Sequence, residues 1–456
     1  MNSLNSRQRK IVCALAILVL LVPIIYLGAP LSSDVVPGQK TAVSGGALAQ
    51  MRHEYELGES TLGDIDPSSA AANLVLLGLR GMAATVLHQN ALEQQDRKEW
   101  GRLKSTVESI LKLQPHYEEV WKFQGWNLAF NVSREWDQVA DRFYWVKEGL
   151  KFLNKGAQRN RTSAFLKHNV GDFVGRKIGT ADESQFYREY FVKDPDVDEY
   201  DGADPATNPE GKDNYLVAYD HFIGANERDD IYPVKGMTRE VFRRAPGQAL
   251  FDYAAAITKD GKFELARAAW EDAHRVWTEG FGSEVFMGLD DVAYKLNSSP
   301  EEILEMAAQN GVTADIQRNT VDRRGKMLNY NFWRDVSKCE QDPLTVRARK
   351  AVADGKKLYA EGEIADSVDA DGTTISPAQR SFEKGIQLWA EVFDKYPGMT
   401  VQDDMVLHAM IAVHYWKEIC KNNGRVPPEE YPLAEFVSEK GRYMGEVLVM
   451  FNREIN

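Results

Sequence analysis

Apolar residues recur at helical spacing between residues 250 and 273, and no other stretch of the chain is as regular. Residues three and four positions apart lie on the same side of an α-helix, so this spacing predicts two helices with one apolar face each. Gly261 stands between them, where a residue without Cβ can adopt the left-handed conformation that ends a helix. The first face consists of Leu250, Tyr253, Ala254 and Ile257, and the second of Ala266, Trp270 and Ala273.

This spacing matches the 34-residue tetratricopeptide pattern, in which two antiparallel helices close on each other with small residues at the points of contact. The indole ring of Trp270 is expected to fill the space left by the alanines. The proline that usually closes such a repeat is missing, since Thr278 stands at that position. A plain helical hairpin is the alternative.

Two other stretches have a related arrangement. A helical pattern from Lys98 to Leu113 ends before Pro115, and a further unit follows that proline with Trp121, Gly125 and Leu128 at packing positions. The later stretch has Ala351, Gly355 and Leu358 before an insertion, and Ala378, Phe382 and Gly385 after it. One unit alone cannot bury its apolar face, so neighbouring units predict a stacked array. The predicted fold class is therefore all-α, with tetratricopeptide-like helical hairpin repeats in an α-solenoid.

The residues from Ile11 to Gly28 form an uncharged apolar run that follows Arg7, Arg9 and Lys10. A run of 18 residues is at the lower limit for a helix that crosses a bilayer. We expect an uncleaved transmembrane anchor, with a removed signal peptide as the alternative. Basic residues before a span stay in the cytoplasm, so both alternatives place the rest of the chain outside it.

At 456 residues the chain is too long for one compact core. We expect a cytoplasmic stub and anchor at 1–28 and a flexible tether, rich in Gly, Ser, Pro and Asp, at 29–67. An N-terminal helical-repeat region follows at 68–300, with an acidic loop near 194–214. A C-terminal helical-repeat region at 301–456 contains the insertion near 363–377. A last helix, from Leu433 to Asn452, is expected to cap the array.

Aspartates crowd two loops of the chain. The second loop runs from Asp366 to Asp371, and the first contains Asp194, Asp196, Asp198, Asp201 and Asp204. Ca²⁺ takes six to eight oxygen ligands from flexible segments of this kind, but the spacing fits no EF-hand. We expect solvated acidic loops and no cofactor, with calcium bound at these loops as the alternative.

The charge balance bears on the class of partner. Lys and Arg total 55 against 68 Asp and Glu, which gives a net charge of −13. A non-specific nucleic-acid binder needs a basic surface that displaces counterions from phosphates, so we expect no nucleic-acid partner.

The sequence contains no motif that identifies an enzyme. HExxH, G-x-S-x-G, Walker A, GxGxxG and CxxCH are all missing. With 68 carboxylates, acidic pairs arise by chance, so a catalytic pair is not identifiable. An interaction protein is therefore expected. An envelope hydrolase without a recognisable motif and a calcium-stabilised structural protein are the alternatives.

Several stretches resemble a family of N-terminally membrane-anchored bacterial helical-repeat proteins of tetratricopeptide-like type. They are Gly78–Gln95 (GLRGMAATVLHQNALEQQ), Leu113–Ser133 and Asn329–Lys350. The activity of this family is unknown, so the resemblance implies architecture and no mechanism. Together with the basic residues before Ile11, an anchored bacterial protein of this kind is expected to cross the inner membrane once, with its N-terminus in the cytoplasm and its body in the periplasm.

Some members of that family carry an "iron-responsive element" label, which the cysteines of this chain do not support. An aconitase-type cluster needs three thiolates in one pocket, and only Cys339 and Cys420 lie outside the predicted anchor. Helical proteins often bury free thiols as small apolar side chains. We expect that here, with one disulfide as the alternative.

In a tetratricopeptide stack, the first helices of successive units line a concave surface that faces a bound segment. The corresponding positions are Lys122, Trp126 and Phe130, then Phe251, Ala255 and Lys259, then Arg349, Lys356 and Tyr359. Aromatic and basic residues gathered there would suit an acidic or aromatic-bearing segment. Packing of Trp126 and Phe130 against a neighbouring helix is the alternative. The predicted function is a scaffold that binds a protein or peptide partner in the envelope.

Overall fold

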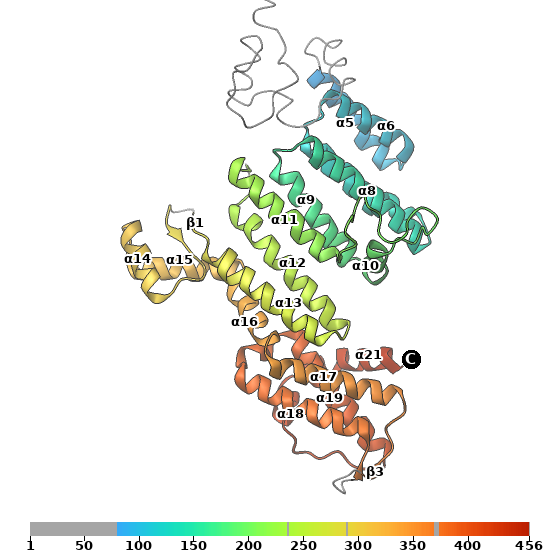
Figure 1. Ribbon diagram of the computed structural model, residues 1–456, viewed down its shortest axis with the longest axis vertical. Coiled ribbons are helices and arrows are strands. Elements are labelled where there is room, and N and C mark those ends of the chain that lie inside the picture. Colours follow the sequence, from blue (N-terminus) through green and yellow to red (C-terminus); the bar gives the residue numbers. More distant parts are fainter. Residues whose placement is uncertain (1–79, 235–236, 289–290, 369–373, 456) are drawn as a thin grey trace, which may run out of the picture. The chain divides into compact units, whose positions relative to one another are not determined.

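A computed structural model describes residues 80–234, 237–288, 291–368 and 374–455 (Figure 1). This part of the chain is all-α, with four strands of two residues each as its only described β-structure. None of its helices is both long and apolar enough to span a bilayer. The predicted anchor at Ile11–Gly28 and the predicted tether at 29–67 lie outside the described residues.

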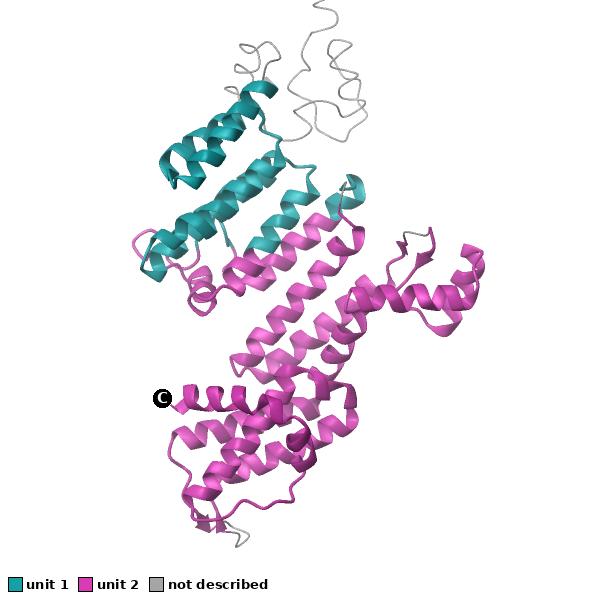
Figure 2. Cartoon of the chain, turned by 180° about the vertical axis from the view of Figure 1, so that it is seen from behind, with its two compact units in different colours: residues 1–173, 204–209, 227–234 teal, residues 174–203, 210–226, 235–456 magenta. Residues whose placement is uncertain are grey.

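The chain divides into two compact units, which Figure 2 colours separately. Unit 1 comprises 1–173, 204–209 and 227–234, and unit 2 comprises 174–203, 210–226 and 235–456. The boundary expected at residue 300 is a different division of the chain and stays a prediction.

Unit 1 is built from pairs of packed helices. The α5 helix packs on α6, α7 on α8, and α8 on α9. At its C-terminal end α7 continues into a π-helical turn, η1, and a 3₁₀ turn, η2. The bounds are α5 Arg80–Asp96, α6 Trp100–Leu113, α7 Glu118–Asn127, η1 Leu128–Val132, η2 Ser133–Glu135, α8 Val139–Arg159 and α9 Ala164–Phe173.

Glycines let α7 and α8 approach each other closely. A Cβ at Gly149 would lie 2.5 Å from the carbonyl oxygen of Gly125, and a Cβ at Gly156 would lie 2.7 Å from the ring of Trp121. The first contact is with backbone and cannot be relieved by turning a side chain. The packing of α7 on α8 therefore depends on the missing Cβ at position 149.

Unit 2 contains the remaining helices, and α11 begins in it. Its main pairs are α12 with α13, α14 with α15, and α17 with α18. The α19 helix packs on α18, and α21 on α19. The first bounds are η3 Val174–Ile178, α10 Ser184–Val192, α11 Asn214–Ile231, α12 Arg239–Lys259, α13 Phe263–Arg275, η4 Val276–Gly280, η5 Phe281–Ser283, α14 Pro300–Asn310 and α15 Ala314–Met327. The others are α16 Tyr330–Glu340, α17 Pro343–Ala360, α18 Pro377–Lys395, η6 Pro397–Val401, α19 Asp403–Asn422, α20 Ala434–Glu439, η7 Gly441–Tyr443 and α21 Met444–Ile455.

The regular stretch from 250 to 273 forms the α12–α13 hairpin. Gly261 lies in the turn with φ +75°, in the left-handed region. The indole Nε1 of Trp270 donates to Thr258 Oγ1 at 3.2 Å, which ties the two helices together. Of the predicted packing residues, Tyr253 is partly buried and the others are buried: Leu250, Ala254, Ile257, Ala266, Trp270 and Ala273. The prediction of a helical hairpin is confirmed, and its assignment to the tetratricopeptide pattern stays a prediction.

Two short antiparallel hairpins were not predicted. The strands β1 (Phe286–Met287) and β2 (Ala293–Tyr294) pair with each other after η5. The strands β3 (Ser367–Val368) and β4 (Thr374–Ile375) pair within the predicted insertion. Strands of two residues are too short to show the alternation of apolar and polar positions by which a strand is recognised.

The prediction of one last helix from Leu433 to Asn452 is wrong, because the chain forms α20, η7 and α21 there. Val437 and Tyr443 are both buried. Six residues turn an α-helix by about 600°, so these two side chains would point apart in one continuous helix. The break at η7 lets both enter the core, where Tyr443 Oη donates to Asp403 Oδ1 at 2.5 Å.

Cys339 and Cys420 are buried, free thiols, as expected. Burial raises the pKa of Cys339 to about 12, although the contact of its Sγ with Thr345 Oγ1 at 3.5 Å acts in the other direction. A thiol with so high a pKa is protonated at neutral pH and unreactive. These cysteines serve as core residues.

Candidate functional site

The earliest three predicted groove residues do lie together. Lys122, Trp126 and Phe130 line a hollow of about 460 Å³ on α7 and η1. Helical spacing explains this, because positions three and four apart share one face. We call this site the α7 hollow, and its lining residues are Glu119, Lys122, Phe123, Trp126, Asn127, Phe130 and Asn131.

The aromatic residues of the α7 hollow are held in place by their neighbours. The rings of Trp126 and Phe130 stack with centroids 5.1 Å apart, and Trp126 also contacts Phe173 of α9 at 5.3 Å. Lys122 Nζ lies 4.9 Å from the ring centroid of Phe165. Trp126 therefore packs on α9, as one sequence-based alternative expected, and it also lines the hollow, while its role in binding stays a prediction.

The polar part of the α7 hollow is nearly neutral. Its lining contains one basic residue, Lys122, and one acidic residue, Glu119. The other polar residues of the lining are Asn127 and Asn131, and Asn131 Nδ2 donates to Asn127 Oδ1 at 2.8 Å. The prediction of a basic groove does not describe this surface, which is aromatic with amide groups.

Phe251 and Arg349 were expected to face a partner, and the structure contradicts both expectations. Phe251 is fully buried, and its ring stacks on Trp333 of α16 with centroids 4.9 Å apart. It also contacts Trp270 and Trp277. The α12 helix is covered on this side as well as by α13, so the face that was expected to be open is core.

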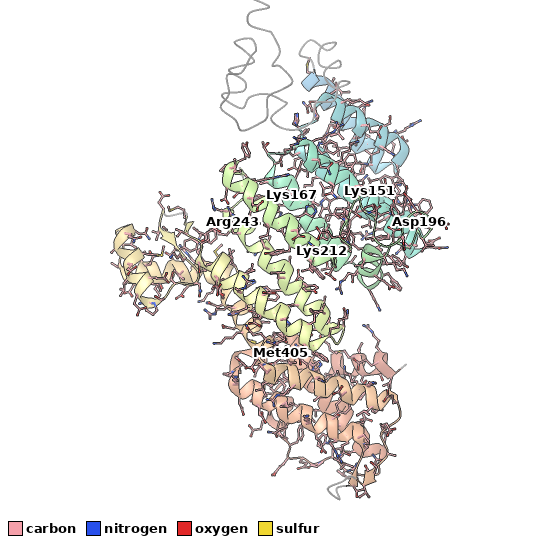
Figure 3. The ribbon with its side chains drawn as sticks, viewed as in Figure 1. Lys151, Lys167, Asp196, Lys212, Arg243 and Met405 are labelled. Atoms are coloured by element: carbon pink, nitrogen blue, oxygen red, sulfur yellow. The ribbon has the colours of Figure 1, made fainter. Side chains whose placement is uncertain are left out.

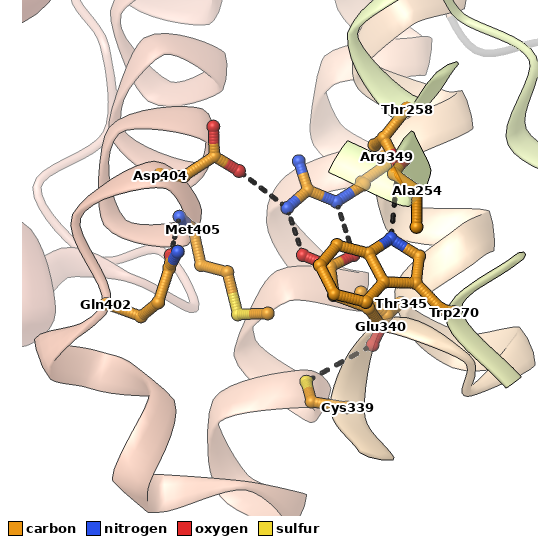
Figure 4. Close-up of polar contacts among 10 residues, drawn as sticks. All are labelled: Ala254, Thr258, Trp270, Cys339, Glu340, Thr345, Arg349, Gln402, Asp404 and Met405. Carbon is orange, nitrogen blue, oxygen red and sulfur yellow. Dashed lines mark hydrogen bonds and ion pairs between the residues drawn. The ribbon is translucent and has the colours of Figure 1, made fainter. Parts of the chain in front are cut away.

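Arg349 belongs to a charge cluster on α16, α17 and α19 (Figure 4), in which Arg349 and Glu340 are buried and Asp404 is half-exposed. Its guanidinium donates from Nε to Glu340 Oε2 at 2.9 Å, again from Nη2 to the other oxygen, and to Asp404 Oδ2 at 2.7 Å. Burial alone would raise the pKa of Asp404, but the ion pair with Arg349 holds this pKa below its usual value. Nε and Nη2 of Arg349 are engaged within the fold, so this residue has a structural role.

The remaining groove positions do not form one open surface. Lys356 Nζ pairs with Glu454 of α21 at 2.7 Å, and the ring of Tyr359 contacts Phe451 of the same helix at 6.2 Å. The C-terminal helix therefore covers the face of α17 that was expected to bind a partner. Lys259 is exposed and Ala255 is partly buried on α12.

The first acidic loop is less solvated than expected. Asp194 and Asp204 are each 3% exposed. The carboxylate of Asp204 accepts from Lys151 Nζ at 2.9 Å and lies 3.5 Å from Lys147 Nζ; Figure 3 labels Lys151 on α8. Among the residues that the structure describes, no three His, Cys, Asp or Glu side chains are grouped so that they could hold a metal ion.

Sequence reasoning missed a second cavity, of about 400 Å³, formed by α6, α7 and α8. We call it the α6–α8 pocket. Each helix contributes residues spaced three or four apart, and the stripe on α8 is Trp145, Glu148, Phe152, Lys155 and Arg159. The α6 helix contributes Lys104, Val107, Glu108, Leu111 and Lys112, α7 contributes Trp121 and Gln124, and Leu128 of η1 and Lys151 of α8 complete the lining. The alternation of aromatic and charged residues on α8 is the sequence signal that would have found it.

Neither a scan of family models nor a search of curated proteins finds a match to this chain. The resemblance to anchored bacterial helical-repeat proteins therefore stays a proposal.

Proposed function

We propose that this chain is a membrane-anchored, extracytoplasmic helical-repeat scaffold of the bacterial envelope that binds a protein segment in the α7 hollow. The observation that carries the proposal is the aromatic lining of that hollow, because Phe123, Trp126 and Phe130 all remain partly exposed there. Aromatic side chains of this kind are common anchors at the centre of protein interfaces.

The geometry favours a peptide segment as the occupant. The rings of Trp126 and Phe130 are already fixed by stacking, so binding costs little further side-chain ordering. Asn131 is partly exposed and adds an amide group, which matches the N–H and C=O groups of a backbone, while the buried Asn127 accepts from it and holds it in place. A segment with one aromatic or large aliphatic residue as its anchor satisfies both parts of the hollow.

The near-neutral lining also sets the charge of the partner. With Glu119 and Lys122 as its only charged residues, the hollow has little net attraction for an acidic segment. We therefore revise the expected partner to an apolar or aromatic segment. Salt screens interactions between exposed charges, so binding at this site is expected to change little with ionic strength.

The sequence supports the wider proposal. If α5–α6 and α7–α8 are tetratricopeptide-like units, α7 is a first helix, and first helices line the binding surface of such arrays. The apolar run from Ile11 to Gly28, with basic residues before it, supports an inner-membrane anchor and a periplasmic body.

Affinity capture from envelope extracts tests the proposal. The double variant Lys122→Glu, Phe123→Ser removes one partly exposed ring and reverses the charge beside it. We expect it to lose the partner that the wild-type chain retains, with an unchanged helical circular dichroism signal. The matched control is Lys326→Glu, Met327→Ser, an exposed basic and apolar pair on α15. Equal recovery by both variants would show that the α7 hollow is not the binding surface.

A further inference from the structure

The α6–α8 pocket concentrates positive charge in an acidic protein. Five basic residues line it against two acidic residues, whereas the whole chain has a net charge of −13. The basic residues are Lys104, Lys112, Lys151, Lys155 and Arg159, and the acidic ones are Glu108 and Glu148. A concave surface of one sign concentrates ligands of the opposite sign.

Most of this charge is not neutralised by the fold. Lys151 pairs with Glu148 at 3.2 Å and with Asp204 at 2.9 Å. Lys104, Lys112 and Lys155 are exposed and make no ion pair with any residue that the structure describes. Like charges placed together destabilise a surface, and this cost falls when an anion binds.

The inner wall of the pocket is apolar and aromatic. Val107, Leu111 and Trp121 are buried, while Trp145 and Phe152 are partly exposed. Trp121 and Phe152 contact each other with ring centroids 4.9 Å apart. A simple inorganic anion would leave this wall unused, so the ligand that fits has an apolar part as well as negative charge.

One buried polar group also lines the pocket. Gln124 is 3% exposed, and its Oε1 accepts a long hydrogen bond of 3.5 Å from Asn127 Nδ2. A side-chain amide carries both donors and an acceptor, so Gln124 can hydrogen-bond a polar group of a ligand in the pocket.

We infer that the α6–α8 pocket binds an acidic segment of a partner polypeptide, in which carboxylates flank an apolar or aromatic side chain. The apolar side chain contacts Trp121 and Phe152, and the carboxylates face Lys104, Lys112 and Lys155. A cavity of about 400 Å³ lies in the range of sites that enclose a small ligand or a few side chains.

This site is separate from the proposed α7 hollow. Trp121 and Gln124 of α7 line the pocket, whereas Lys122, Phe123 and Trp126 line the hollow. The two sites therefore use different side chains of one helix. They also differ in charge, because only the pocket is strongly basic.

Fluorescence anisotropy with defined peptides tests the inference, using the full-length chain in an uncharged detergent. The probe is the hexapeptide DEFLED carrying a zwitterionic rhodamine label. We expect DEFLED to bind at low salt at least about tenfold more tightly than NQFLQN, which lacks the charges, or DESSED, which lacks the apolar residues. Binding of DEFLED is expected to weaken when salt is raised.

Variants assign the binding to the pocket. Changing Lys104, Lys112 and Lys155 together to Gln is expected to weaken DEFLED binding by about tenfold or more. Glu108→Gln removes an exposed carboxylate from the lining and is expected to tighten binding about twofold. The matched control changes Lys326, Lys338 and Lys350 to Gln, three exposed lysines that do not line the pocket.

The outcomes separate this inference from the proposed function. The inference would be overturned if DEFLED binding weakened equally in the Lys104, Lys112, Lys155 variant and in the Lys326, Lys338, Lys350 control. Tight binding of NQFLQN would also overturn it. DEFLED binding that is lost in the Lys104, Lys112, Lys155 variant and normal in the Lys122→Glu, Phe123→Ser variant would support the α6–α8 pocket. This outcome does not depend on whether the α7 hollow binds a partner.

Discussion

At the scale of single residues, Asp252 shows how burial sets a pH dependence. Burial on α12 raises its pKa from 3.8 to about 6, although the hydrogen bond from Gln248 Nε2 at 3.2 Å and the charge of Arg176 act in the other direction. The folded state therefore binds this proton more tightly than the unfolded state. Asp252 therefore contributes to the stability of the fold at pH values below the pKa that it has in the unfolded state. This contribution is lost as pH rises through the pKa that it has in the folded state.

Asp252→Asn is thus expected to stabilise the protein at neutral pH, because Asn stays uncharged. A pKa shift of two units sets an upper limit of about 3 kcal/mol, and we expect about 1–3 kcal/mol. The measurement is the free energy of unfolding between pH 4 and 7.5, over which the difference from wild type should grow. Asp354→Asn, at an exposed position, is the control. A difference that stays constant with pH would contradict the account.

The sequence also failed to predict which individual side chains are exposed. Helical spacing placed Phe251 and Arg349 on a free face, but spacing shows only which residues share a face. It does not show what packs on that face. Trp333 covers Phe251, and Asp404 pairs with Arg349, through contacts between segments far apart in the sequence. Glu340, which also pairs with Arg349, lies nine residues away on the preceding helix. Lys122, Trp126 and Phe130 were placed correctly as neighbours, because all three lie on consecutive turns of one helical segment.

At the scale of elements, the α12–α13 hairpin rests on small residues at the helix contact. Ala266 is 3% exposed, and Ala273 is fully buried. Such a contact has no room for a larger side chain without a shift of the helices. The hairpin was predictable because three sequence signals agree. Apolar residues recur every three or four positions, Gly261 stands between the two helices, and Ala266, Trp270 and Ala273 alternate in size along the second helix.

Ala266→Phe is therefore expected to destabilise the protein by about 1–3 kcal/mol through overpacking. Lys262→Phe introduces the same ring at the start of α13, where the lysine side chain is 62% exposed, and should cost almost nothing. Urea denaturation of both variants measures the difference. Equal midpoints would remove the assignment of Ala266 to the helix contact.

Other elements had no comparable signal. The π-helical turns η1 and η4 continue α7 and α13 without a proline or a run of polar residues that would mark a change in helix type. The covering of α17 by α21 depends on pairs such as Lys356 with Glu454, which are 98 residues apart. Such pairs follow from the tertiary fold and not from a local pattern.

At the scale of the whole molecule, the two candidate surfaces both lie in unit 1. The α7 hollow and the α6–α8 pocket use residues 104 to 159 only. In unit 2, the predicted partner positions are largely used for internal packing, as Phe251, Arg349, Lys356 and Tyr359 show. The proposed binding sites are therefore both in unit 1.

Site-specific photo-crosslinking in living cells tests the binding claim most directly. A benzophenone amino acid replaces Lys122 or Asn131 in the α7 hollow, or Lys326 on α15 as a control. We expect a discrete adduct with an envelope protein from each position in the hollow, and none from position 326. Adducts from the control position alone, or no adduct from positions 122 and 131, would contradict it.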